Sequence, residues 1–246
     1  MLAAAVSLCA KAPYLISILL FYAVPGIYVT VLFGNARQAA KNLLFAVVTS
    51  IPFTIVVDFI GTASHVWYVP QTVFPARLLG VVPWEDFLWM GVATYTIVTL
   101  YAVVSDKGNH KIASRRMLYF VAIASLAINV LFALLLSGLS TLFILNSRYT
   151  YLGLGVTFFA APASLFLWRS PQFLRRVAPL VGYFFYATIV FELCATVLRQ
   201  WIFVGTYLLP PLRFFGIGPI PYEELFFVGI VGPVAAIAFY EFCEVD

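Results

Sequence analysis

The sequence contains few charged residues. Only 10% of its 246 residues are Asp, Glu, Lys or Arg, whereas 63% are hydrophobic and the mean hydropathy is +1.02. Soluble domains carry about 25% charged residues, so this composition excludes a soluble globular protein. The long apolar runs instead predict helices, because a helix leaves few backbone polar groups unpaired in lipid. We expect an all-α, polytopic membrane helical bundle.

The chain also lacks the patterns of several kinds of site. Its three cysteines, Cys9, Cys194 and Cys243, are far apart and form no Cys-x-x-Cys or Cys/His spacing, so neither a disulfide framework nor a metal site is predicted. No basic block suggests binding of nucleic acid. No Gly-x-Gly-x-x-Gly follows a strand, and no lysine lies in the interior of a predicted span. We therefore expect no cofactor, neither a flavin nor retinal on a Schiff base.

Seven apolar runs are long enough to cross a membrane. Breaks at clusters of polar residues, glycine and proline predict spans at about Ala12–Phe33, Ala40–Ile60, Trp84–Val104, Leu118–Ser137, Tyr149–Trp168, Pro179–Trp201 and Tyr222–Tyr240. Alternate loops lie on opposite faces, and nine of the 14 Lys and Arg residues fall on the face reached after the first, third and fifth spans. By the positive-inside bias we expect a cell-membrane protein with the N-terminus outside and the C-terminus in the cytoplasm.

One sequence pattern occurs twice. Asp58 is followed after eight residues by Trp67, as Glu192 is by Trp201. Later residues correspond at a nearly constant offset, namely Arg77 with Arg213, Gly80 with Gly216 and Pro83 with Pro221. Self-similarity at a fixed period indicates an internal repeat.

The repeat predicts how the chain is divided. We expect one transmembrane domain, residues 1–246, with repeat one at about 12–105, a linker helix at about 117–138 and repeat two at about 149–242. Three helices in each repeat and one helix between them place both copies the same way up in the membrane.

Six of the ten acidic residues are expected at one membrane level, on the non-cytoplasmic half. Two stand near the ends of helices that run toward this face and four at the starts of helices that leave it: Asp58, Glu192, Glu85, Asp86, Glu223 and Glu224. A carboxylate inside the hydrocarbon costs about 3 kcal/mol, so carboxylates gathered at one depth should face a cavity or one another. Helix capping is the alternative for the four at helix starts. It does not account for Asp58 and Glu192, because the helix dipole disfavours negative charge near a C-terminal end.

Aromatic residues are dense around this level. The two segments that precede Glu85 and Glu223 are rich in proline and suit the headgroup interface or a re-entrant lid. Aromatic faces stabilise a cation by about 2 kcal/mol each when desolvated, without trapping it. A buried carboxyl that keeps its proton could protonate an alkene in such a cavity. For any single ring, an ordinary interfacial belt is an equally good explanation. The rings expected to line the cavity are Trp67, Tyr68, Trp84, Trp89, Trp201, Tyr222, Phe226 and Phe227.

Two further polar residues follow the lone carboxylates. His65 stands seven residues after Asp58, and Arg199 seven after Glu192, on the same helical face if the helices extend that far. A structural ion pair or a headgroup contact is the favoured interpretation for Arg199. His65 could also accept a proton.

Together the two copies of the motif carry a family resemblance. They read Asp58-x8-Trp67-Tyr68, Arg77-Leu-Leu-Gly80, Pro83-x-Glu85-Asp86-Phe-Leu, and then Glu192-x8-Trp201, Arg213-Phe-Phe-Gly216, Pro221-x-Glu223-Glu224-Leu-Phe-Phe. The pattern, from about Ile51 to Phe239, resembles the lycopene cyclase domain family. This is the non-flavin type found as paired bacterial subunits, fused archaeal proteins and the N-terminal part of fungal bifunctional enzymes. The first copy has Asp86 where the family pattern is Pro-x-Glu-Glu.

The resemblance implies a redox-neutral isomerase that closes rings at the ends of lycopene or another linear carotenoid, C40 or C50. It implies catalytic roles for Glu85, Asp86, Glu223 and Glu224, with Asp58 and Glu192 in support, and no cofactor. The aromatic set, with His65, Arg77 and Arg213, would contact substrate. The expected partners are the carotenoid, membrane lipid and other enzymes of the carotenoid pathway.

Several alternatives stay open. A membrane prenyltransferase would need a Mg²⁺ site for diphosphate, but the sequence has no Asp-x-x-x-Asp. A carotenoid hydratase or a non-catalytic carotenoid-binding protein could use the same cavity. A proton-coupled transporter would also gather carboxylates between repeats, although nearer the membrane midplane and with Gly or Pro breaking its spans.

Overall fold

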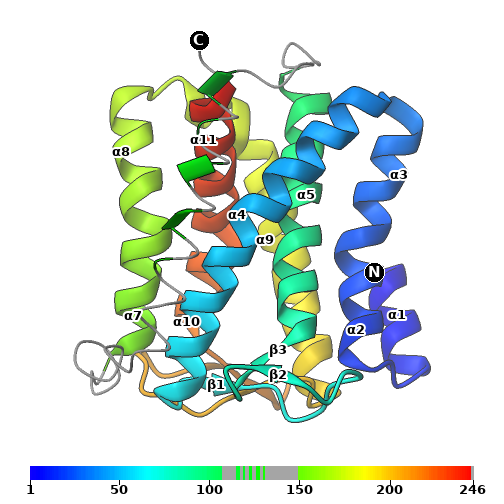
Figure 1. Ribbon diagram of the computed structural model, residues 1–246. Helices are drawn as coiled ribbons and strands as arrows, with labels where there is room; N and C mark the ends of the chain where they lie inside the picture. Colours follow the sequence, from blue (N-terminus) through cyan, green and yellow to red (C-terminus); the bar gives the residue numbers. More distant parts are fainter. Residues whose placement is uncertain are drawn as a thin grey trace.

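The computed structural model describes residues 1–106 and 149–244, together with residues 115, 116, 119, 122, 123, 126, 127 and 130. The protein is an all-α membrane helical bundle (Figure 1). Within the described residues, six helices are long and apolar enough to cross a membrane: Tyr14–Phe33, Ala36–Ala63, Trp84–Val104, Thr150–Arg169, Phe173–Val197 and Tyr222–Cys243. The expected span at Leu118–Ser137, and with it the linker helix, lies outside the continuous described ranges.

The first half begins with a short helix before its first span. Its elements are α1 (Leu2–Cys9), α2 (Tyr14–Ile18), η1 (Leu19–Ala23), α3 (Val24–Phe33), α4 (Ala36–Ala63), β1 (Trp67–Tyr68), β2 (Arg77–Leu78), β3 (Val82–Pro83) and α5 (Trp84–Val104). Helix α1 is separate from the first span and packs against α9 of the other half.

The second half follows the same order without the leading helix, except that its last span is divided into three segments. The elements of this half are α7 (Thr150–Gly155), η3 (Val156–Ala160), α8 (Ala161–Arg169), α9 (Phe173–Val197), β4 (Ile202–Phe203), β5 (Leu212–Phe214), β6 (Ile217–Ile220), α10 (Tyr222–Glu224), η4 (Leu225–Val231) and α11 (Gly232–Glu244). The two halves meet where α5 packs against α9 and α11.

Among the described residues, three spans contain a π-helical segment, and a proline follows each segment within two residues. Pro25 follows η1, Pro162 follows η3 and Pro233 follows η4. Proline has no amide hydrogen and its ring crowds the carbonyl one turn earlier, so the preceding turn widens. By contrast, Pro52 and Pro179 lie inside α4 and α9, which stay α-helical.

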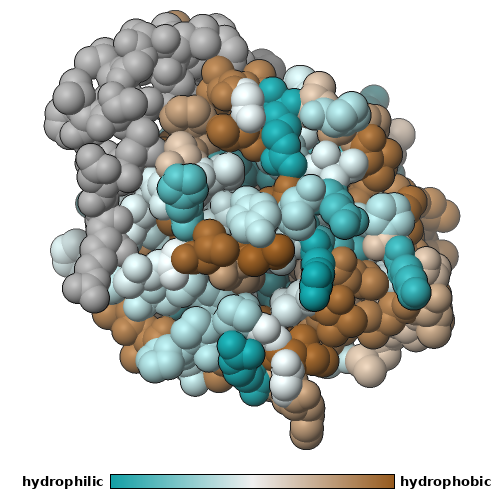
Figure 2. Space-filling model, turned by 90° about the horizontal axis from the view of Figure 1, so that it is seen from below, coloured by the Kyte–Doolittle hydropathy of each residue, from teal (hydrophilic) through white to brown (hydrophobic). Residues whose placement is uncertain are grey.

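The extramembrane segments of both halves lie at one end of the bundle, the lower end in Figure 1. Each half forms an antiparallel hairpin there, β2 with β3 and β5 with β6. Both hairpins turn through a glycine in the left-handed region, Gly80 at φ +78° and Gly216 at φ +84°, where a side chain would be strained. Strands β1 and β4 pair with each other, so the two halves are joined at this end. Figure 2 shows hydrophilic residues on this face among hydrophobic ones.

The predicted boundaries of the second and sixth spans needed corrections. The second span runs over Ala36–Ala63 and not Ala40–Ile60. The sixth span begins at Phe173 and not at Pro179, because the proline is accommodated within the helix instead of starting it. It also ends at Val197, before Trp201, which belongs to the turn that leads into β4. The third span was predicted with its observed bounds, Trp84–Val104.

Candidate functional site

All six predicted carboxylates are buried. Asp58, Glu85, Asp86, Glu192, Glu223 and Glu224 are each no more than 6% exposed. They come from α4, α5, α9 and α10, near the end of the bundle that carries the strands. In the described part of the chain, none of the hydrogen bonds to these six groups comes from a lysine or arginine.

The first acid of each pair holds the loop that precedes it. Oε1 of Glu85 accepts hydrogen bonds from the backbone amides of Val73 and Phe74, at 2.5 and 3.0 Å. Oε1 of Glu223 accepts one from the backbone amide of Leu208. These two glutamates therefore fix the extramembrane segments to the starts of α5 and α10.

The second acid of each pair accepts a hydrogen bond from a tyrosine. The hydroxyl of Tyr14 donates to Oδ1 of Asp86 at 2.9 Å, and the hydroxyl of Tyr151 donates to Oε2 of Glu224. Neither tyrosine was among the predicted site residues. The repeat could have revealed them, because each stands near the start of the first span of its half.

The two lone carboxylates differ in their surroundings. Oε2 of Glu192 accepts a hydrogen bond from Nε1 of Trp201 at 3.0 Å, and its carboxyl group contacts that of Glu224. Asp58 lies beside Nε1 of Trp67, but this contact does not reach the geometry of a hydrogen bond.

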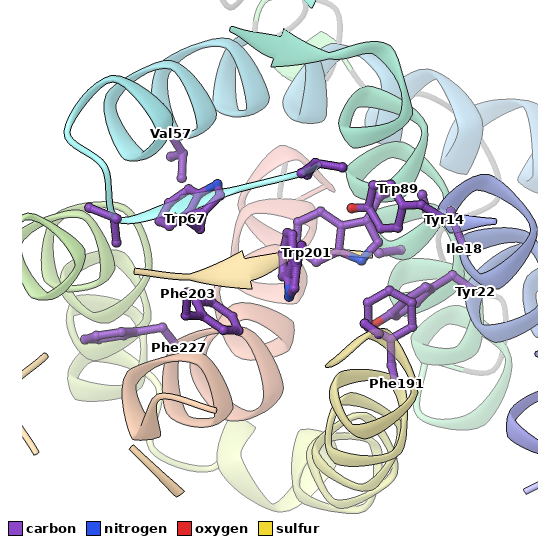
Figure 3. Close-up of a cluster of buried hydrophobic side chains, with 14 of the residues drawn as sticks. Tyr14, Ile18, Tyr22, Val57, Trp67, Trp89, Phe191, Trp201, Phe203 and Phe227 are labelled. Carbon is purple, nitrogen blue, oxygen red and sulfur yellow. The ribbon is translucent and has the colours of Figure 1, made fainter. Parts of the chain in front are cut away.

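Half of the predicted aromatic set gathers around the carboxylates. Trp67, Trp89, Trp201 and Phe227 are buried in one hydrophobic cluster, with the three indoles between α4 and α9 in Figure 3. The rings of Trp89 and Trp201 meet edge to face, with centroids 5.6 Å apart. The other four predicted rings are 40–49% exposed and point out of the cluster: Tyr68, Trp84, Tyr222 and Phe226.

The predicted basic residues lie outside the cluster. His65 and Arg213 are exposed. Arg77 is half-buried, and its guanidinium donates to the carbonyls of Val81 and Val69, at 3.1 and 2.6 Å. Arg77 thus braces the β2–β3 hairpin.

Tyr207 covers the carboxylate cluster from the extramembrane side. Its ring packs on Tyr151 at 6.0 Å, and its hydroxyl donates to the carbonyl of Val66 at 2.7 Å. Burial raises the pKa of Tyr207 above its ordinary value, and the nearby carboxyls of Glu224 and Glu223 act in the same direction. The hydroxyl therefore keeps its proton and its hydrogen bond.

A large apolar cavity lies next to the carboxylates. It has a volume of about 540 Å³ and runs from Tyr22 and Trp89 toward Phe45 and Ile97, between α4, α5, α8, α9 and α11. A second space of about 40 Å³ shares walls with it, including Trp89 and Phe159. Asp58, Glu224, Trp67 and Tyr151 line this smaller space.

The described residues offer no metal site. Among them, no three His, Cys, Asp or Glu side chains come together in a way that could hold a metal ion. The cluster pairs carboxyls with tyrosine and tryptophan donors, which suits proton transfer in an apolar cavity.

Comparison with family models, with curated proteins and with solved structures finds no match, so the resemblance seen in the sequence stays a prediction.

Proposed function

We propose that this protein is a carotenoid cyclase that closes a terminal ring of lycopene or a similar linear carotenoid by acid catalysis. One observation carries the proposal: buried carboxyls of both halves line a small space that borders a long apolar cavity. A cavity of several hundred cubic ångströms with few polar groups is the usual form of a site for an apolar ligand.

The cavity suits a substrate dissolved in the membrane. Three of its lining residues, Thr157, Ala161 and Leu165, are exposed and follow one another at four-residue intervals. They belong to the span Thr150–Arg169, so the cavity reaches the surface at membrane depth. A linear polyene would enter from this side with its end group toward the carboxyls.

Glu224 is the best candidate for the acid. It lines the small space, and Tyr151 donates a hydrogen bond to one of its oxygens. Its contact with Glu192 places two carboxyls together. Two such groups are held together best when they share a proton, because two negative charges would repel in a dry site.

The reaction needs no oxidant and no leaving group. The proton of Glu224 adds to C2 of the terminal double bond and leaves a tertiary cation at C1. The C5=C6 bond attacks this cation, so the C1–C6 bond forms and the charge moves to C5. Loss of the proton on C6 to a carboxylate gives a β-ring, and the number of atoms and electrons is unchanged. Asp58, which lines the same small space, would accept that proton.

The indole rings would protect the cation. Trp67, Trp89 and Trp201 surround the small space and offer π-faces but no nucleophile. Each such face stabilises a desolvated cation by about 2 kcal/mol. The burial of the carboxyls excludes bulk water, which would otherwise add to the cation and yield an alcohol.

The charge distribution supports an orientation in the cell membrane. The strand-bearing end would lie outside the cell and the C-terminus in the cytoplasm, as expected from the positive-inside bias. Association with other enzymes of the carotenoid pathway would supply the linear substrate.

Expression in bacteria that accumulate lycopene tests the proposal. Pigments are extracted and separated, and the amount of folded protein in the membrane is measured in parallel. We expect β-carotene or γ-carotene. Unchanged lycopene in cells with abundant folded protein would contradict the proposal, and a hydroxylated carotenoid would favour a hydratase instead.

A further inference from the structure

The two repeat-related pairs of carboxylate and tryptophan are not equivalent. In the second half, Trp201 donates a hydrogen bond to Glu192 at 3.0 Å. In the first half, Asp58 lies beside the buried Nε1 of Trp67, but this contact does not reach the geometry of a hydrogen bond. We call the second pair closed, because its indole is hydrogen-bonded to its carboxylate, and the first pair open.

Two differences in sequence explain the open pair. Asp58 is shorter than Glu192 by one methylene, so it reaches less far toward its tryptophan. Three residues after each acid stand Gly61 and Ala195. A Cβ at Gly61 would lie 2.2 Å from Cζ2 of Trp67. The indole therefore packs directly against the backbone of Gly61, and an alanine there would clash with it. Trp67 thereby lies back against α4.

The small space of about 40 Å³ lies beside this open pair, between residues of both halves. Asp58, Trp67, Tyr151 and Glu224 line it, and the Glu224 side chain is 2% exposed. The space also borders the large apolar cavity. A few polar groups that converge beside an apolar cavity are the usual form of a ligand-binding site.

The repeat-related position, between Glu192 and Asp86, is closed by the start of the first span. A separate hollow of about 740 Å³ is lined by Tyr14 and Gln200 but by no carboxylate and no indole. The ring of Tyr14 packs on Trp201 with centroids 6.2 Å apart. Nε2 of Gln200 donates to the carbonyl of Ala12 and to Oγ of Ser17, at 2.8 and 2.7 Å. These contacts hold the start of the first span against Trp201. Neither large nor small cavity is lined by Asp86, the acid that Tyr14 bonds.

We propose that only the space between Asp58 and Glu224 receives the end of a linear polyene, and that Gly61 keeps this space open by letting Trp67 lie against α4. This inference rests on the proposed function and deepens it. A single receiving site means that one end is closed at a time, so a bicyclic product requires release and rebinding of a monocyclic one.

Matched exchanges at the two repeat-related positions test the inference. In the full chain, Gly61→Ala pushes Trp67 off α4 into the small space, whereas Ala195→Gly leaves Trp201 bonded to Glu192. The first readout is the ring-closing rate per folded protein. The second is quenching of tryptophan fluorescence by lycopene added to the purified protein in detergent, which needs no catalysis. We expect Gly61→Ala to lower the rate by about 10- to 100-fold and to weaken quenching, and Ala195→Gly to keep both.

A second pair of variants, at Tyr151 and Tyr14, tests the inference if Gly61→Ala does not fold. Tyr151→Phe removes the donor that orients Glu224, while Tyr14→Phe removes its counterpart on the covered side. We expect a rate loss only for Tyr151→Phe, with folded protein recovered in both. Equal losses of the ring-closing rate in the two members of either pair would overturn the inference, because both repeat-related positions would then take part in ring closure.

The readouts separate this inference from the proposed function. If the normal chain binds lycopene without closing a ring, the proposed function fails, and the quenching difference between Gly61→Ala and Ala195→Gly still decides whether the small space receives the polyene. If the normal chain closes rings, a monocyclic product must appear before the bicyclic one in a time course. A bicyclic product that forms without a free monocyclic precursor would overturn the single receiving site.

Discussion

The hydroxyl of Tyr151 donates a hydrogen bond to Glu224, and the same relationship joins Tyr14 to Asp86 in the other half of the chain. In both halves the tyrosine belongs to the first span and the acid to the start of the last one. The bond therefore ties together the two ends of each half around a buried carboxyl.

The two glutamates at the start of α10 are expected to differ when mutated. Glu224→Gln removes the transferable proton, so ring closure should fall by at least about 100-fold, the usual contribution of a general acid. Glu223→Gln keeps an oxygen that can accept from the Leu208 amide, so its loss of activity should be smaller. Pigment analysis per folded protein checks both. Equal activity of Glu224→Gln and the unaltered chain would contradict the role of Glu224 as the acid.

The tryptophan that holds Glu192 should contribute more to stability than its counterpart. Trp201→Phe leaves the carboxyl without its indole donor, whereas Trp67→Phe removes a donor that has no partner. Both changes remove the same volume from positions that are 5% exposed. We expect the free energy of unfolding to fall by about 1–3 kcal/mol more for Trp201→Phe. Unfolding in detergent followed by circular dichroism measures the difference, and a larger loss for Trp67→Phe would contradict it.

Arg77 and Arg213 occupy matching positions in the two hairpins but only Arg77 is half-buried and bonded to two carbonyls. Arg77→Ala should lower the free energy of unfolding by about 1–3 kcal/mol. Arg213→Ala, at an exposed position, should change it by less than about 0.5 kcal/mol. Thermal unfolding of the two variants under identical conditions makes the comparison. Similar losses would show that the Arg77 bonds do not brace the hairpin.

Chemical labelling of one cysteine tests the predicted orientation in the membrane. Cys9 is exposed, whereas Cys194 and Cys243 are buried. If the N-terminus lies outside the cell, a membrane-impermeant maleimide added to intact cells should label the protein, and Cys9→Ser should abolish the label. Labelling of Cys9 only after cell lysis would contradict this orientation and indicate the opposite one.

The sequence predicted the bundle and the level of the carboxyls, because apolar runs and repeated acidic pairs are local patterns. It placed the start of α5 at Trp84 and of α10 at Tyr222, where proline precedes each helix. The six acids prove to be buried together, which the cost of charge in lipid had indicated.

Other features depended on packing between distant segments. The spacing of Trp84, Glu85 and Trp89 gives their relative directions around α5, but only the neighbouring helices decide that Trp84 faces outward and Trp89 inward. The ribbon between β1 and β4 joins residues of separate halves, and strands of two residues leave no periodic signal. Tyr14 and Tyr151 stand at matching positions of the two repeats, but only the fold brings each of them to an acid more than seventy positions away.

Ring closure in D₂O tests the central claim most directly. The acid exchanges its proton with solvent, so the protein in detergent should convert lycopene into a cyclic product of unchanged elemental formula that carries one deuterium at C2 for each ring closed. Mass spectrometry of the extracted pigment measures this. A product that has gained water or lost hydrogen, or a cyclic product without deuterium from the fully exchanged protein, would contradict ring closure by a carboxylic acid.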